Sequence, residues 1–453
     1  KDSSSMAESI AIWIEETDGM VLNRHRYVAH VIFEVILGWE VIWPSSKIEW
    51  NAAGFRLQYG GVSPEASSQL TWVPASGLLT GGGLQWIWSD SKGPGIPGVG
   101  RLPFGVPNAL HERIDADWWS WVFWMVTRME EQAPPQESLD GFGRFKASAS
   151  LGHQEGWLKR PEVESRVYSW AKSHGKEPAS RSFSVVPTVD VDSAFAYKHR
   201  SFYRATGAAI RDALRGDWSR IKERKKVLRG EVSDPFDTYD WLERIHRQHG
   251  LRARYFFLLA DRSEHDRGMS WKSNGIKALI RRVKATADIG IHPGFASHES
   301  QNIERLTDEI ARLHALSEEG VLHSRQHYLL QRCGPSWRRL EAAGIEHDYT
   351  LGFADEVGFR AGMSRPFPAF DLAKDERMSL TLHPLAAMDA TLQRYMGCTP
   401  AEALDELESL ANEVKAVDGS MMLLWHNETV SDRWDWEGWR TVYEEVFSLI
   451  CQN

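Results

Sequence analysis

Cysteine is scarce in this sequence: the 453 residues include only Cys333, Cys398 and Cys451. The number is odd and the three positions are far apart, which fits neither a disulfide framework nor a thiolate metal site. We therefore expect three reduced thiols with structural roles.

Long apolar runs are also missing. No stretch approaches the roughly 18 apolar residues of a membrane span, and residues 1–6 do not form the apolar core of a signal peptide. These absences predict a protein without a membrane span and with a cytoplasmic location.

The sequence has no excess of basic residues. Its 53 Lys and Arg are outnumbered by 62 Asp and Glu, giving a formal net charge of -9. Because affinity for a phosphate backbone depends on clustered Lys and Arg, this balance argues against a nucleic-acid partner. The one basic run, residues 220–226, is interpreted as the solvated face of a helix.

The remaining composition is that of an ordinary globular protein, with 42% hydrophobic and 25% charged residues. A chain of this length has room for two to three domains. A turn-rich stretch near residues 175–182 predicts a domain boundary. We expect a smaller α+β domain over residues 1–178 and a second domain over residues 179–453.

Beyond residue 179, short apolar strands alternate with longer helical stretches. Such a repeated β-then-α pattern is typical of a parallel sheet or a closed (β/α) barrel. The predicted strands are 182–189, 253–260, 288–292, 322–328, 347–353, 379–385 and 421–426.

Polar residues occur at or just after the ends of these predicted strands. In (β/α) barrels the carboxyl ends of the strands form the active site, so several polar residues at these positions favour a site there. The residues are Asp190, Asp261, His292, Arg325, Asp348, His383 and His426.

The first of these strands ends in two carboxylates. In an extended segment Asp190 and Asp192 point to the same face. One could then hold a cation while the other takes a proton. The alternative interpretation is a loop whose acidic residues only cap neighbouring backbone groups.

Five short motifs, in this order, resemble those of the polysaccharide deacetylases of the NodB-homology group, carbohydrate esterase family 4. The resemblance is closest to a bacterial subgroup with an extra N-terminal domain of unknown function, and it extends over nearly the whole chain. The matching segments are 188–192, 290–293, 325–328, the predicted strand that carries Asp348, and 424–426.

This resemblance implies a distorted (β/α)7-type barrel preceded by a smaller α+β domain. It also implies a hydrolase acting on non-peptide C–N bonds: a metal-dependent N-deacetylase that removes acetyl groups from an N-acetylated sugar or polysaccharide. The implied cofactor is a divalent metal, zinc, and the implied partner is the carbohydrate substrate.

Roles for individual residues follow from the same resemblance. Asp190 would be the base, held ionised by Arg325 through a charge-assisted pair. His426 would be the general acid, oriented by Asp348.

For the metal, the resemblance implies Asp192 and His292 as ligands. The family's second metal histidine should follow His292 by four residues, where this chain has alanine. His298, two residues later, is the predicted third ligand. Other histidines that could substitute are His327 and His383.

Three functions are therefore compatible with the sequence. The first is the deacetylase. The second is a catalytically degenerate barrel that binds a glycan or a protein, and the third is a barrel hydrolase that acts on another amide. The residues indicate neither the glycan nor the oligomeric state.

Overall fold

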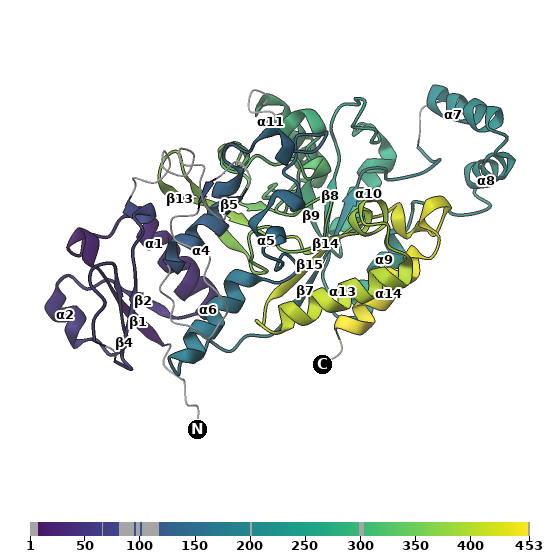
Figure 1. The fold of residues 1–453 in the computed structure, drawn as a ribbon. Coiled ribbons are helices and arrows are strands. Elements are labelled where there is room, and N and C mark those ends of the chain that lie inside the picture. Colours follow the sequence, from purple (N-terminus) through teal and green to yellow (C-terminus); the bar gives the residue numbers. More distant parts are fainter. Residues whose placement is uncertain are drawn as a thin grey trace.

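The computed structural model describes residues 8–65, 67–80, 95–96, 100–101, 117–199, 202–298 and 303–451. Within these ranges the strands form a four-stranded sheet, a nine-stranded sheet and a short two-stranded ribbon, β5 (Gly95–Ile96) with β6 (Gly100–Arg101). Figure 1 shows the small sheet and its helices in purple and blue, beside the larger sheet and its helices in teal, green and yellow.

The small sheet is entirely parallel, with strand order β2-β1-β3-β4. Its strands are β1 (Ser9–Ile14), β2 (Glu40–Ile42), β3 (Arg56–Tyr59) and β4 (Leu70–Val73). Between β1 and β2 the chain passes through α1 (Asn23–Ala29) and the π-helix His30–Leu37, and α2 (Lys47–Ala52) lies between β2 and β3. Helices thus connect β1 to β2 and β2 to β3, which allows these strands to lie parallel in one sheet. The assignment of residues 1–178 to an α+β domain stays a prediction.

Helix α4 (Trp118–Thr127) joins the small sheet to the large one. The side chain of Asp117 caps it by accepting a 3.0 Å hydrogen bond from the backbone N–H of Ser120. All ten residues of α4 are buried. Trp119 stacks on Tyr59 of β3, and Phe123 lies edge-on against Phe370 of strand β12 (Phe367–Asp371) in the large sheet. Two more helices follow, α5 (Leu151–Gln154) and α6 (Glu162–Ser173).

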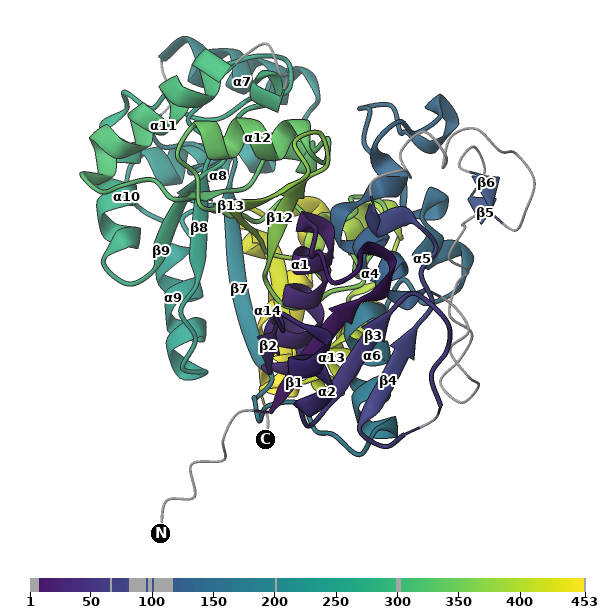
Figure 2. The same cartoon turned by 90° about the vertical axis from the view of Figure 1, so that its left-hand side faces the viewer.

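The nine-stranded sheet has the order β12-β13-β11-β10-β9-β8-β7-β15-β14, and Figure 2 shows β7, β8 and β9 side by side. Adjacent strands of this sheet run parallel to each other, except β12 and β13, which are antiparallel. Each of the seven predicted strands is present, whereas closure of the sheet into a barrel stays a prediction. The strands are β7 (Ser184–Val191), β8 (Arg254–Phe257), β9 (Asp288–Ile291), β10 (His323–Ser324), β11 (His347–Asp348), β12 (Phe367–Asp371), β13 (Glu376–Leu382), β14 (Ala387–Met388) and β15 (Ser420–His426).

Helices follow most of these strands. Among the described residues, none of the helices has both the length and the apolar character needed to cross a membrane. Helix α7 lies at the outer edge of the molecule in Figure 1, whereas α8 contacts the turn after β15, where Arg220 lies over the Trp434 ring and Glu223 pairs with Arg433. The helices are α7 (Phe202–Leu214), α8 (Trp218–Leu228), α9 (Tyr239–Gln248), α10 (Asn274–Lys284), α11 (Ile303–Ser317), α12 (Pro335–Ala342), α13 (Pro400–Lys415) and α14 (Trp439–Ile450).

One continuous apolar core runs through both sheets, from the residues of β1 to those of α14. Tyr27 of α1 contributes to it by packing on Phe370, with ring centroids 4.7 Å apart. Helices α1 and α4 of the N-terminal segment, the described residues before 179, therefore cover the β12 edge of the large sheet. The boundary between residues 178 and 179 stays a prediction.

Candidate functional site

The polar residues expected at strand ends come from neighbouring parallel strands. Asp190 lies within β7 and Asp192 just beyond it, and His292 directly follows β9. Arg325 directly follows β10, and His426 is the last residue of β15. Because these strands are parallel, their carboxyl ends lie at the same edge of the sheet.

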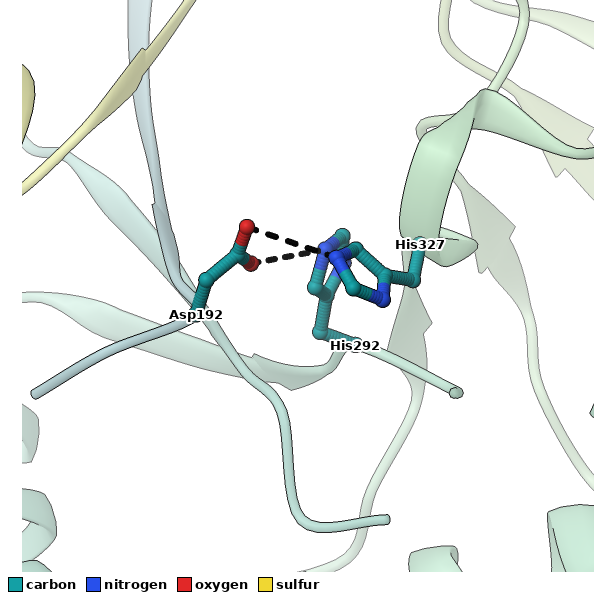
Figure 3. Close-up of side chains that lie close together, drawn as sticks. All are labelled: Asp192, His292 and His327. Atoms are coloured by element: carbon teal, nitrogen blue, oxygen red, sulfur yellow. Dashed lines mark ion pairs between the residues drawn. The ribbon is translucent and has the colours of Figure 1, made fainter. Parts of the chain in front are cut away.

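Three of the side chains at this edge form a compact group. Asp192, His292 and His327 each offer one ligand atom, and these atoms lie within 4.8 Å of one another. Asp192 Oδ1 is 3.3 Å from His292 Nε2, and Asp192 Oδ2 is 3.3 Å from His327 Nε2. Figure 3 shows both imidazole rings turned toward the carboxylate.

Hydrogen bonds on the far side of each ring determine which nitrogen faces the group. His292 Nδ1 is 2.6 Å from the backbone carbonyl of Arg325, which can only accept, so Nδ1 carries the proton. His327 Nδ1 donates to the Asp266 carboxylate at 2.9 Å. In the neutral rings both Nε2 atoms therefore present a lone pair to Asp192, as in metal sites where a carbonyl or carboxylate orients each histidine.

Asp266 is itself held in place. It accepts a 2.8 Å hydrogen bond from the backbone N–H of Phe295 and a 2.9 Å bond from the hydroxyl of Ser263. Burial would raise the pKa of Asp266, but the bonds from His327 and these groups outweigh it and lower the pKa. The support behind His327 is thus a stable anion.

Two buried atoms of this group have no hydrogen-bond partner, as expected of atoms that bind a metal ion. Asp192 Oδ1 and His292 Nε2 are buried and have no hydrogen-bond partner, although they face each other. Two ligand atoms of a tetrahedral zinc ion, with bonds of about 2.0–2.1 Å, lie about 3.3 Å apart. His292 Nε2 lies at this distance from Asp192 Oδ1, and His327 Nε2 lies at this distance from the other oxygen, Oδ2. One carboxylate and two imidazoles also form a donor set that zinc uses in catalytic sites.

The charges in this group depend on one another. Burial would lower the pKa of His327, but the Asp192 and Asp266 carboxylates raise it to about 9. Burial would raise the pKa of Asp192, but His327 and His292 hold it well below its usual range. A proton on His327 therefore balances the carboxylates, and a cation bound to the group would displace that proton.

Asp190 lies on one side of the group and is paired with Arg325. Its Oδ1 accepts a 2.9 Å bond from Arg325 Nη1, and its Oδ2 is 3.6 Å from His292 Nε2. Arg325 is fully buried and also donates to the Thr188 hydroxyl and to the carbonyl of Tyr349. The guanidinium thus fixes one oxygen of Asp190 and leaves the other facing the metal group.

His426 lies on the other side, with Nε2 3.8 Å from Asp192 Oδ2. Its Nδ1 donates to Asp389 Oδ1 at 2.9 Å, and its backbone N–H donates to Asp389 Oδ2 at 2.8 Å. Burial would lower the pKa of His426, but Asp389, together with Asp192 and Asp190, raises it to about 10. At neutral pH this imidazole therefore carries a proton that it can donate.

The expectation that Asp348 orients His426 is wrong. Asp348 is buried beside β10, where it accepts hydrogen bonds from Gln331 Nε2 and from the backbone N–H of Thr350. Burial raises its pKa to about 6. The carboxylate that orients His426 belongs to Asp389, which directly follows the two-residue strand β14.

The expectation that His298 is the third ligand is also wrong. His298 ends a 3₁₀ helix (Phe295–His298), where its Nδ1 lies 2.5 Å from the carbonyl of Phe295. The third donor is His327, which the sequence indicated only as a possible substitute. His383, the other substitute, contacts His347 instead.

Residues of the N-terminal segment reach the rim of this site. Arg144 donates to the backbone carbonyl of Tyr328, the residue after His327, at 3.0 Å and to the hydroxyl of Tyr395 at 2.9 Å. Phe142, which is 38% exposed, lies against the Tyr328 ring with centroids 5.1 Å apart. Nothing in the sequence indicated that the turn carrying both residues has a place at the site.

A comparison with family models finds a match in the first part of the chain. A family model described as a family of unknown function (DUF7033) matches residues 13–173. A comparison with curated proteins finds no match.

Comparison with solved structures finds distant likenesses. A polysaccharide deacetylase candidate from Mycobacterium smegmatis is 16% identical, with 60% of this chain and 85% of that chain covered at a TM-score of 0.40. A second candidate, from Pseudomonas aeruginosa PAO1, is 12% identical, with 61% and 90% covered at 0.34. A mutant of the CE4-family pseudoenzyme BA3943 with restored enzymatic activity is 11% identical, with 60% and 65% covered at 0.30. At these identities and TM-scores none of them establishes the activity of this chain.

Proposed function

We propose that this protein is a metal-dependent carbohydrate N-deacetylase, which hydrolyses the amide of an N-acetylated sugar to acetate and an amine. One observation carries the proposal: Asp192, His292 and His327 form a metal-compatible group between a carboxylate, Asp190, and a protonated imidazole, His426. Amide hydrolysis requires a base and an acid on either side of the carbonyl carbon.

The proposed ligands are Asp192, His292 and His327, and the proposed ion is zinc. When bound, a divalent ion polarises the amide carbonyl and makes water more acidic. Asp192 and the two rings each offer one ligand atom, and these atoms lie within 4.8 Å of one another. The hydrogen bonds that the rings donate to the Arg325 carbonyl and to the Asp266 carboxylate keep the rings in this orientation.

Asp190 is the proposed base. Its free oxygen, Oδ2, faces the ligand group, while Arg325 holds Oδ1 in place. Asp190 takes a proton from the attacking water as the new C–O bond forms. The pairing with Arg325 keeps the carboxylate pointed at that water.

His426 is the proposed acid. Its Nε2 gives a proton to the amide nitrogen as the C–N bond breaks, so the amine leaves in a neutral form. Asp389 prepares this step, because its hydrogen bond to Nδ1 directs the ring and its charge keeps the ring protonated at neutral pH.

Acetate release from tri-N-acetylchitotriose by the zinc-loaded protein tests the proposal. We expect Asp190→Asn to lower kcat about 100-fold or more, since positioned acid–base groups contribute about 10²–10⁴-fold. Asp261→Asn is the matched control: Asp261 also follows a strand, but its side chain is 81% exposed and paired with Arg312, so its activity should equal that of the wild type.

The other two interpretations predict different results. A catalytically degenerate barrel would release no acetate from any N-acetylated sugar, with or without metal. A hydrolase acting on another amide would show metal-dependent activity that Asp190→Asn abolishes, yet no activity on sugars. The degenerate interpretation was based on the alanine where a metal histidine was expected, and His327 supplies a third donor at a different position.

A further inference from the structure

Helices α7 and α8 form a hairpin that combines positive charge with exposed apolar side chains. Residues 211–229 contain eight Lys and Arg but only three Asp and Glu, although the whole chain has a net charge of -9. The positive charge of the protein is therefore concentrated here. The large apolar side chains that the hairpin exposes are Ile210, Leu214, Trp218 and Leu228.

Helix α8 is attached to the molecule by one side. Glu223 pairs with Arg433 and accepts a 3.0 Å hydrogen bond from the hydroxyl of Tyr197. Val227 lies in a small apolar cluster with Tyr197. The exposed side of the helix carries three positive charges and no negative one. Its exposed residues are Trp218, Ser219, Lys222, Lys225, Lys226 and Leu228.

Helix α7 is attached through Asp212, which is buried and pairs with Arg224 of α8. Ile210 and Leu214 lie two residues before and two residues after Asp212. Because two residues turn an α-helix by about 200°, both side chains lie on the side of α7 opposite to Asp212. Figure 1 shows α7 at the outer edge of the molecule. Its outer side is therefore an exposed apolar surface.

The most exposed of these apolar side chains flank the turn between the two helices. Leu214, which is 84% exposed, ends α7, and Trp218, which is 63% exposed, begins α8. Helices that lie in the surface of a bilayer insert leucine and tryptophan below the headgroups and keep lysine on their polar face. Tryptophan is favoured at that depth because its ring is amphipathic. The hairpin therefore has the residue types of a membrane-surface segment.

The charge of the whole protein selects the part that can approach an anionic surface. A net charge of -9 repels such a surface, so only a part with local positive charge can contact it. A nucleic acid would use the lysines and could stack on Trp218, but it would leave the aliphatic side chains exposed. A bilayer of anionic lipids uses both the lysines and the aliphatic side chains.

We propose that the outer side of the α7–α8 hairpin docks on the surface of an anionic lipid bilayer. Leu214 and Trp218 insert below the headgroups. The lysines of α8 (Lys222, Lys225 and Lys226) lie against the lipid phosphates. This inference does not depend on the proposed function, because none of these residues belongs to the metal group or to its base and acid.

Sedimentation with lipid vesicles tests the contribution of the lysines. The wild type should bind vesicles of equal parts phosphatidylglycerol and phosphatidylcholine, and should bind phosphatidylcholine alone much more weakly. Replacing the three lysines of α8 with glutamine should weaken binding to the mixed vesicles about 100-fold, which corresponds to about 1 kcal/mol for each lysine. The matched control removes the same charge from exposed lysines elsewhere and should bind as the wild type does. It combines Lys172→Gln, Lys277→Gln and Lys374→Gln.

Leu214→Ser tests the contribution of the apolar side chains. It should weaken binding to the mixed vesicles about tenfold, because the leucine side chain no longer leaves water. Ile48→Ser is the matched control, since Ile48 is an 81% exposed apolar residue on α2, and it should not change binding.

The proposal is overturned if the wild type does not sediment with the mixed vesicles or binds both kinds of vesicle equally. It is also overturned if either test variant binds the mixed vesicles as its control does. Binding of single-stranded RNA that needs the lysines but not Leu214, without binding to vesicles, would assign the surface to a nucleic acid and contradict the proposal. None of these outcomes affects the deacetylase, which acetate release tests separately.

Discussion

Replacing Asp389 with asparagine tests the acid assigned to this site. The Asp389 carboxylate lies 2.9 Å from His426 Nδ1 and is fully buried, so its charge acts on the ring with little screening. It is the largest influence that raises the pKa of His426, which reaches about 10 against an ordinary value of 6.5.

The size of the effect follows from these values. Oδ2 of Asp389 accepts from the His426 backbone N–H, so the carbonyl oxygen of asparagine should take that position and its NH₂ group should face Nδ1. If the pKa falls to about 6.5, only about 3% of the ring is protonated at pH 8. We therefore expect kcat at pH 8 to fall about 30-fold, with a smaller loss near pH 6.

The assay is the pH dependence of acetate release. A general acid must be protonated, so activity declines as pH rises through its pKa, and a lower pKa moves this decline to lower pH. Asp348→Asn is the matched control: it also removes a buried carboxylate, but one that contacts Gln331 and Thr350, so the alkaline limb should not move. If activity of the folded Asp389→Asn variant declines at the same alkaline pH as that of the wild type, His426 is not the acid.

Three further predictions concern the structure around the site. Arg144→Ala removes two hydrogen bonds between the N-terminal segment and the rim, and we expect kcat/KM for acetate release to fall about tenfold, with zinc content unchanged. Glu131→Gln removes the buried carboxylate that pairs with Arg128 and Arg360, and urea denaturation should show that the free energy of unfolding falls by about 3–5 kcal/mol. A decrease of less than about 1 kcal/mol would show that these ion pairs do not stabilise the fold. Burial raises the pKa of Glu309 from 4.5 to about 7, so ionising it opposes folding and stability falls as pH rises between these values. Between pH 5 and pH 8 the wild type should therefore lose more stability than Glu309→Gln, by up to about 3 kcal/mol, and equal losses would show that Glu309 does not titrate in this range.

The sequence predicted the strands of the large sheet well. Each of the seven predicted strands begins or ends within a few residues of an observed one, because apolar strand runs alternated with long helical patterns. Strand β14 has only two residues and β12 pairs antiparallel at an edge, so neither produced a separate signal. The parallel order of the small sheet was missed because its short strands and turns gave no clear alternation.

The site was predicted in part. Asp190, Asp192, His292, Arg325 and His426 do come together. His298 was chosen for its spacing from His292 along the chain. His327 lies after β10, the strand that pairs with β9, and the sequence does not show which strands are neighbours in the sheet. Asp389 could have been noticed as a polar residue after an apolar run, but nothing in the sequence placed it beside His426 rather than Asp348.

The metal content of two histidine variants tests the central claim most directly. The protein, its His327→Gln variant and its His298→Gln variant are dialysed against the same zinc buffer and measured by inductively coupled plasma mass spectrometry. We predict about one zinc ion per chain in the wild type and in His298→Gln, and little or none in His327→Gln, since two remaining ligands hold zinc weakly. Zinc that is retained in His327→Gln and lost in His298→Gln would contradict the account.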